Sequence, residues 1–115
     1  MSDLRIHNVL LPATVLGTDL DFYRALLGVE PLFVDGERYA ALPPSDGVGV
    51  ALAAGGEAVA DRPALVLRTA DLEAAVRRVV ALGGSVLAEA VNGPHELRAV
   101  VADPSGNPLV LSQKH

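Results

Sequence analysis

The chain has 115 residues, the usual size of one domain, and half of them are hydrophobic while 20% are charged. This balance, with a mean hydropathy of +0.36, excludes intrinsic disorder and predicts a single globular domain spanning residues 1–115. Fourteen acidic against nine basic residues give a net charge of −5, and no run of basic residues could follow a phosphate backbone, so we expect no nucleic-acid partner.

The first half of the chain predicts a strand, a helix and three more strands. Ile6 to Ala13 is a β-prone stretch, and the helix-like segment after it ends at Gly28. Thr18 and Asp21 form a candidate capping pair just after a glycine that weakens the helix, so we expect the regular helix to begin only at Asp19. The strands that follow are predicted at residues 30–34, 38–42 and 48–53.

The second half repeats this order at an offset of 55 residues. Thr14 and Gly28 are 14 positions apart, as are Thr69 and Gly83, and each Thr closes a β-prone stretch. Internal similarity of this kind indicates duplication. It predicts two βαβββ modules, at about residues 4–55 and 61–113.

The helix of the second module has clear amphipathic spacing. Its apolar positions recur every three or four residues, at Leu72, Ala75, Val76, Val79 and Leu82. Thr69 or Asp71 can cap its first turn, and Gly83-Gly84 supplies the left-handed residue that ends it. The remaining strands are predicted at residues 85–91, 97–102 and 109–113.

Several compartments and chemistries are excluded by what the chain lacks. No cysteine is present, which rules out disulfides, thiolate catalysis and sulfur-rich zinc sites. The longest run of apolar residues and glycine covers ten positions, 47–56, whereas a membrane-spanning helix needs about 20. Asp3, Arg5 and His7 interrupt any apolar segment of signal-peptide length. We therefore expect no membrane partner and a cytoplasmic location.

Each of the two modules contains one recognisable motif. Phe22-Tyr23 precedes Leu26-Leu27-Gly28 in the first helix, and Asp103-Pro104-Ser105-Gly106-Asn107 precedes the final apolar strand. In both respects the chain resembles the vicinal oxygen chelate superfamily, which includes glyoxalases, bleomycin resistance proteins and extradiol dioxygenases. The resemblance covers about Ile6 to Gln113. It implies an α+β fold in which two tandem βαβββ modules form curved mixed sheets around a central cavity, and it implies a homodimer.

The resemblance also implies where a metal would bind. Enzymes of this superfamily hold a divalent ion with His, Glu or Gln from the first and last strand of each module. The corresponding positions in this chain are Asn8 or Val9, Ala51 or Leu52, Pro63 or Ala64, and Val110. Only Asn8 could bind an ion, and weakly, although a slip of one residue would bring His7 inward. We therefore expect no metal and no other cofactor.

The candidate ligand-binding residues are His7, Asn8, Tyr39, His95 and Arg98. His7 is a candidate base or ligand anchor, and the alternative is a solvated imidazole. His95 and Glu96 follow Gly93-Pro94, where either a lid over the cavity or an ordinary polar turn fits the sequence.

Two arginines and the aromatic residues leave further alternatives. Arg38 and Arg98 either face inward and pair with an anionic ligand or face outward as solubilising charges. Tyr39 is the aromatic side chain we expect at the cavity, with core packing as the alternative. The other aromatic residues are expected in the packing between helix and sheet: Phe22, Tyr23 and Phe33. Lys114-His115 lies beyond the last predicted strand, so we expect it to be frayed, and His115 has no assigned role.

Three functions remain open, because a fold does not determine chemistry. The first is a metal-free protein that binds or sequesters a small hydrophobic metabolite or antibiotic in an aliphatic cavity. The second is a metal-independent isomerase, cyclase or lyase in which His7, His95 or a carboxylate acts as general base. The third is a metal-dependent glyoxalase-like lyase or dioxygenase whose ligands lie outside the expected positions.

Overall fold

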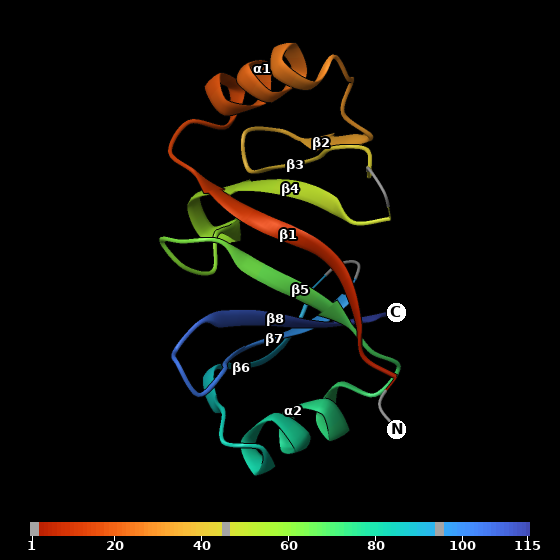
Figure 1. Ribbon diagram of the computed structural model, residues 1–115, viewed down its shortest axis with the longest axis vertical. Helices are drawn as coiled ribbons and strands as arrows, with labels where there is room; N and C mark the ends of the chain where they lie inside the picture. The colour runs from red at the N-terminus through yellow and green to blue at the C-terminus, as the bar shows by residue number, and fades with distance from the viewer. Residues whose placement is uncertain (1–2, 45–46, 94–95) are drawn as a thin grey trace. The chain divides into compact units, whose positions relative to one another are not determined.

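A computed structural model describes residues 3–44, 47–93 and 96–115 (Figure 1). The chain forms two compact units. The first unit is Asn8–Pro63, and the second combines the chain up to His7 with Ala64–His115. The division lies inside strand β1 (Arg5–Ala13), so the opening residues of this strand belong to the second unit.

The first unit packs one helix on a four-stranded sheet. After β1 come α1 (Leu16–Leu27), β2 (Phe33–Asp35), β3 (Tyr39–Ala41), β4 (Gly49–Ala54) and a 3₁₀ turn, η1 (Gly55–Glu57). The strand order is β2-β3-β4-β1, with β1 parallel to β4 and the other pairs antiparallel. The core between α1 and the sheet contains Ala13, Leu16, Ala40, Leu52 and Ala54.

Helix α1 begins earlier than the sequence predicts. It starts at Leu16 rather than Asp19, its N-cap is Val15, and no side chain caps its first turn. Leu16 is buried in the core of the first unit, so packing fixes the start of the helix in place of a capping bond. The predicted pair of Thr18 and Asp21 is therefore inside the helix. The predicted end is confirmed, because Gly28 follows with a left-handed φ of 66°.

The second unit has the same arrangement (Figure 1). Its elements are β5 (Ala64–Arg68), α2 (Leu72–Ala81), β6 (Ser85–Asn92), β7 (Glu96–Ala102) and β8 (Pro108–Lys114). The strand order is β5-β8-β7-β6, with β5 parallel to β8 and the other pairs antiparallel. The core under α2 contains Leu72, Ala75, Ala99, Val101 and Leu111. The predicted α+β fold with a repeated βαβββ order is confirmed.

The capping predicted for the second unit is confirmed in detail. The Asp71 side chain accepts a hydrogen bond from the Ala74 amide at 3.1 Å and caps α2. Gly83 takes a φ of 101° just after the helix. Before β8, the Asp103 carboxylate accepts hydrogen bonds from the Ser105 and Asn107 amides, both at 2.9 Å. The Asp103 motif is thus a closed turn that positions the last strand.

Two predictions about the end of the chain and the aromatic residues are wrong. Lys114 is not frayed, because it is the last residue of β8 and pairs in the ladder with Glu96. Phe22 and Phe33 are not core residues, since 58% and 52% of their surfaces are exposed. Tyr23 does pack against the core of the first unit, as predicted.

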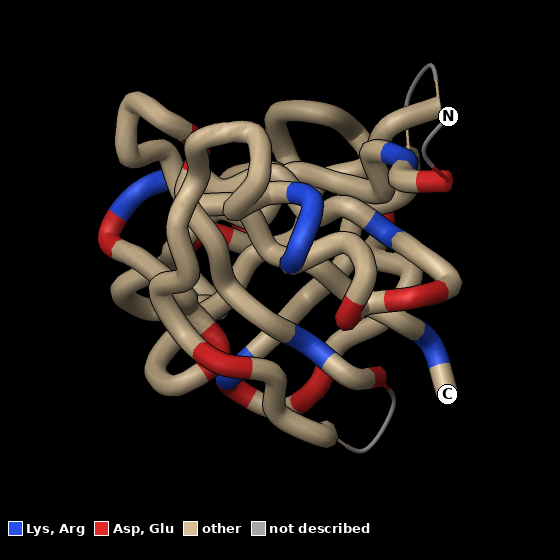
Figure 2. The backbone as a smooth tube through the Cα atoms, turned by 90° about the horizontal axis from the view of Figure 1, so that it is seen from below, with Lys and Arg blue, Asp and Glu red and all other residues tan. Residues whose placement is uncertain are grey.

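Charged residues lie singly or in short runs along the chain, as Figure 2 shows, with no extended basic segment. None of the helices in the described part of the chain has the length and apolar character that a membrane crossing requires.

Candidate functional site

The strand register of the second unit sorts its side chains onto two faces. Leu67, Leu111 and Ala99 belong to one row across β5, β8 and β7 and face α2. Side chains alternate between faces along a strand, so the residues between them face away from the helix. This second surface is called the helix-free face.

Polar residues gather on the helix-free face at one end of the strands. Arg68 pairs with Ser112, and Ser112 pairs with Arg98, which makes one row across three neighbouring strands. In the next row Lys114 lies opposite Glu96. In the row on the other side, all three positions are valines and all are buried: Val66, Val110 and Val100. The helix-free face therefore changes from apolar to polar along the strands.

Ser112 and Glu96 are bonded to each other at the centre of this arrangement. Ser112 is completely buried, and its hydroxyl donates a hydrogen bond to Glu96 Oε2 at 2.5 Å. Glu96 is half-buried. The bond satisfies a hydroxyl that would otherwise be buried at a cost, and it fixes the direction of the carboxylate.

The pKa of His7 is shifted by the charges of these residues. Partial burial lowers the pKa of His7, and the positive charges of Arg68 and Lys114 lower it further, while Glu96 acts in the opposite direction. The imidazole is therefore mainly neutral at pH 7 and can accept a proton. We call His7 and the three residues whose charges act on its pKa, Arg68, Glu96 and Lys114, the cluster of the second unit.

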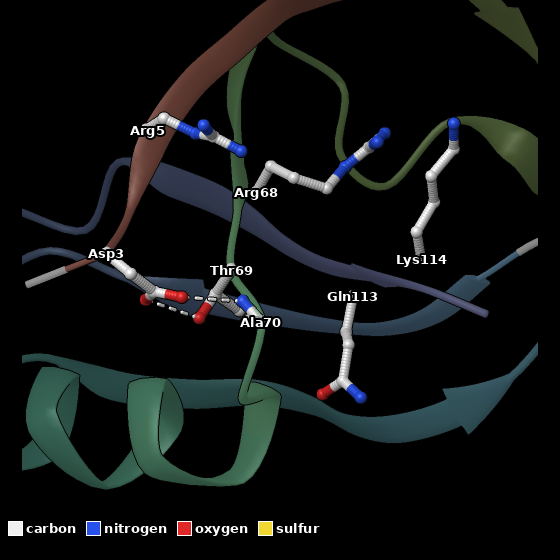
Figure 3. A pocket seen from close by; sticks show the side chains of 7 residues that line it. All are labelled: Asp3, Arg5, Arg68, Thr69, Ala70, Gln113 and Lys114. Carbon is white, nitrogen blue, oxygen red and sulfur yellow. Dashed lines mark hydrogen bonds between the residues drawn. The ribbon is translucent and has the colours of Figure 1, made fainter.

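A pocket of about 820 Å³ opens at the carboxyl ends of β5 and β8. It is lined by Asp3, Arg5, Arg68, Thr69, Ala70, Gln113 and Lys114 (Figure 3). Asp3 accepts hydrogen bonds from the Thr69 hydroxyl and the Ala70 amide, and Gln113 Oε1 accepts one from the Leu72 amide at 2.7 Å. All of these residues belong to the second unit.

The predicted site residues fall in different places. His7 and Arg98 lie in the cluster of the second unit. Tyr39 is in the first unit, where it pairs with Ala53 and its ring lies 6.2 Å from that of Phe33. Asn8 is also in the first unit. His95 lies outside the described residues.

The surroundings of Asn8, Tyr39 and Arg38 show which side chains are buried and which are exposed. Asn8 Oδ1 is buried and has no hydrogen-bond partner in the described part of the chain. Ala40 and Leu52 face α1, and Tyr39 alternates with Ala40 along β3, so its side chain is on the side of the sheet away from α1. Arg38, by contrast, is exposed and pairs with Asp35 at 2.6 Å, which fits the solubilising alternative.

The residues present do not fit a divalent metal. The superfamily's ligand positions carry Asn8, Ala51, Ala64 and Val110 or their neighbours, most of which have no donor atom. Within residues 3–44, 47–93 and 96–115, no three His, Asp or Glu side chains are close enough together to hold one ion.

Sequence analysis missed Ser112, Arg68, Lys114 and Arg5 and interpreted Glu96 as part of a loop. The pattern Glu96-Leu97-Arg98 places two charged side chains on one face of a strand, and Ser112-Gln113-Lys114 places a hydroxyl and a charge on one face of the next strand. This signal was readable only if both strands were extended by one residue. The ends of β7 and β8 depend on their pairing with each other, which local sequence does not reveal.

Comparison with known proteins now adds to this geometry. A family model described as "Glyoxalase-like domain" matches residues 8–112. The chain is 37% identical over 114 residues to an uncharacterized protein of Mycolicibacterium smegmatis, covering 96% of this chain and 95% of that protein. It is also 39% identical over 97 residues to the anthracycline biosynthesis protein DauV of Streptomyces sp. strain C5. That match covers 79% of this chain and 34% of the Streptomyces protein.

Solved structures share the fold. Methylmalonyl-CoA epimerase from Mycobacterium tuberculosis has a TM-score of 0.71 at 20% identity, over 96% of this chain and 87% of that chain. A glyoxalase/bleomycin resistance protein/dioxygenase superfamily member from Vibrio splendidus 12B01 has a TM-score of 0.69 at 20% identity. There the match covers 96% of this chain and 99% of the other. At these identities the likeness concerns the fold alone.

Proposed function

The chain belongs to the glyoxalase-like family of the vicinal oxygen chelate superfamily, and we propose that it binds a small organic molecule on the helix-free face of its second unit without a metal. The ligand has a polar part that reaches the half-buried Arg68 and Arg98 at the polar end of this face. Small-molecule sites combine apolar walls with a few fixed polar groups.

The observation that carries the proposal is the bonded pair of Ser112 and Glu96 between two arginines. Ser112 has no exposed surface, yet it holds a carboxylate on a half-buried strand position. Burying such polar groups costs free energy, which apolar residues at these positions would avoid. A binding role accounts for the polar end of a face that is otherwise lined by valines.

The metal-free part of the proposal rests on the donor set. Three of the superfamily's four ligand positions carry alanine, valine or another side chain without a donor atom, and Asn8 is a weak ligand. The relative named for anthracycline biosynthesis supports a small organic ligand, since that protein's name refers to small-molecule chemistry.

A second candidate function is a metal-independent isomerase or lyase, and Glu96 favours it. The carboxylate is held by Ser112 at 2.5 Å, and the neutral imidazole of His7 belongs to the same cluster. Two groups that can each take or give a proton at one site are what general acid–base catalysis requires. The same fold occurs in a methylmalonyl-CoA epimerase, which is an isomerase, and this supports the second candidate.

The proposal is tested by screening small organic metabolites by thermal shift on the metal-free protein and mapping each hit by amide chemical shifts. We expect hits to move the signals of β5, β7 and β8, and Arg98→Gln to weaken binding by about tenfold or more, because a charged hydrogen bond is lost. Arg77→Gln on exposed α2 is the matched control and should bind as the native chain does.

Two results would contradict the proposal. One is a set of hits that map to other parts of the chain and bind with the same affinity to the Arg98→Gln variant. The other is binding that appears only after a divalent ion is added. The second candidate function predicts in addition that a ligand of this face exchanges a proton with deuterated water, and that Glu96→Gln stops the exchange while binding persists.

A further inference from the structure

Three cationic side chains from three separate segments line the pocket at the carboxyl ends of β5 and β8. Arg5 comes from the start of β1, Arg68 ends β5 and Lys114 ends β8. Figure 3 shows them in one row, with Asp3, Thr69 and Gln113 on the side of the pocket toward α2. The fold therefore gathers positive charge at one point of a chain whose net charge is −5.

These three cationic side chains lack the carboxylate partners that three arginines elsewhere in the chain have. Within the described residues, neither Arg5, Arg68 nor Lys114 has a carboxylate within 4.0 Å. Elsewhere arginines are paired at 3.2 Å or less: Arg24 with Glu30, Arg38 with Asp35, and Arg77 with Glu73. The pocket is thus a place where cationic side chains remain available.

The one acidic residue of the pocket is already engaged. Asp3 accepts hydrogen bonds from the Ala70 amide at 2.7 Å and the Thr69 hydroxyl at 2.8 Å. Both of its oxygens are used at the turn between β5 and α2. With three cations and one carboxylate, the lining carries two positive charges in excess, which suits a doubly charged anion.

One of the three cations also carries a buried donor without a hydrogen-bond partner in the described part of the chain. This donor is Arg68 Nε. Gln113, by contrast, points toward α2, where its Oε1 accepts a hydrogen bond from the Leu72 amide at 2.7 Å, so it lies away from the row of cations (Figure 3). A buried donor left unpaired costs free energy that an anionic oxygen would recover.

We propose that this pocket binds a dianionic phosphate group through Arg5, Arg68 and Lys114. The proposal rests on the proposed function in that Arg68 and Lys114 also border the helix-free face, so it assigns an anionic end to the ligand. Arginine offers paired N–H groups that match tetrahedral oxyanions, and lysine adds a mobile point charge.

The test uses inorganic phosphate and phenyl phosphate on the full chain, followed by NMR at constant ionic strength with chloride as the reference anion. We expect both phosphates to shift the amide signals of Thr69, Ala70 and Gln113. Arg68→Gln and Lys114→Gln should each weaken binding by about tenfold. Arg77→Gln, which removes a paired arginine of α2, is the matched control.

Each outcome decides the proposal. Phosphate binding that both pocket substitutions weaken supports it, and tighter binding of phenyl phosphate than of inorganic phosphate identifies an organic ester as the source. Equal shifts with chloride, or loss of affinity in Arg77→Gln alone, would overturn it. If Arg68→Gln does not fold, Lys114→Gln, at an exposed strand end, gives the same decision. Metabolite hits that map to the helix-free face while phosphate fails would leave the proposed function standing without this pocket.

Discussion

Asp3 connects the amino-terminal segment to the turn between β5 and α2 through a single carboxylate. Its hydrogen bonds from the Ala70 amide and then from the Thr69 hydroxyl lower the pKa of Asp3 below the ordinary 3.8. A carboxyl group whose pKa is lower in the folded chain contributes stability above its unfolded pKa. It loses this contribution as the pH falls through the folded pKa.

The substitution Asp3→Asn should therefore lower the urea midpoint of unfolding near pH 7, and the difference from the native chain should shrink as the pH falls below 3.8. Urea titrations at several pH values measure it. Asp61→Asn removes the same charge from an exposed position of the first unit and should show no comparable pH dependence. A native-to-variant difference that stays constant down to acidic pH would rule out this role for Asp3.

The roles of single residues could be predicted from sequence where they depend on neighbouring residues in the chain. They could not be predicted where they depend on the pairing of a strand with its partner. Asp71 as a cap and Gly83 as a helix end follow from local chemistry and are confirmed. The face on which Arg98 lies could not be predicted, because it depends on the pairing of β7 with β8. Ser112 looked like an ordinary strand residue until its burial and its bond to Glu96 were known.

In the connection between α2 and β6, the backbone at Gly84 lies so close to α2 and β7 that a side chain would not fit. A Cβ at Gly84 would lie 2.5 Å from the Ala102 carbonyl oxygen and 2.6 Å from Val79 Cγ1. The Gly84 amide also donates to the Val79 carbonyl at 2.9 Å. The glycine therefore brings the end of the helix directly onto strand β7.

Gly84→Ala should destabilise the chain by about 1–3 kcal/mol, the usual cost of forcing extra atoms into a packed region. Gly17→Ala is the matched control, because nothing lies within 4 Å of its Cβ position and it sits in α1. That change should be neutral or stabilise by up to ~1 kcal/mol through helix propensity. Chemical unfolding measures both, and equal effects of the two substitutions would contradict the steric argument.

The elements themselves were predictable to a large extent, since every predicted helix and strand is present. The amphipathic spacing of α2 and the turn signals carried most of this information. Helix α1 shows the limit. Its start was placed at Asp19 from local capping chemistry, but the burial of Leu16 begins the helix three residues earlier. Tertiary packing overrode a local preference there.

Large apolar side chains on α1 are exposed to solvent. Leu16, Leu20 and Tyr23 turn to the core of the first unit. Phe22 and Leu26, one helical turn apart on the outer side, have 58% and 65% of their surfaces exposed. Exposed apolar patches of this kind are typical of interaction sites in soluble proteins. They support the expectation, taken from the superfamily, that the chain forms a homodimer.

We therefore expect light scattering to show a dimer at micromolar concentration and Leu26→Glu to convert it to a monomer, because a charge cannot be buried there without a partner. Leu87→Glu is the control, since Leu87 on edge strand β6 is 57% exposed. If only Leu87→Glu separates the subunits, two copies associate through the edge strand, as unpaired edges allow. A native chain that is monomeric at every concentration would refute the dimer altogether, and the apolar side of α1 would then need a different partner.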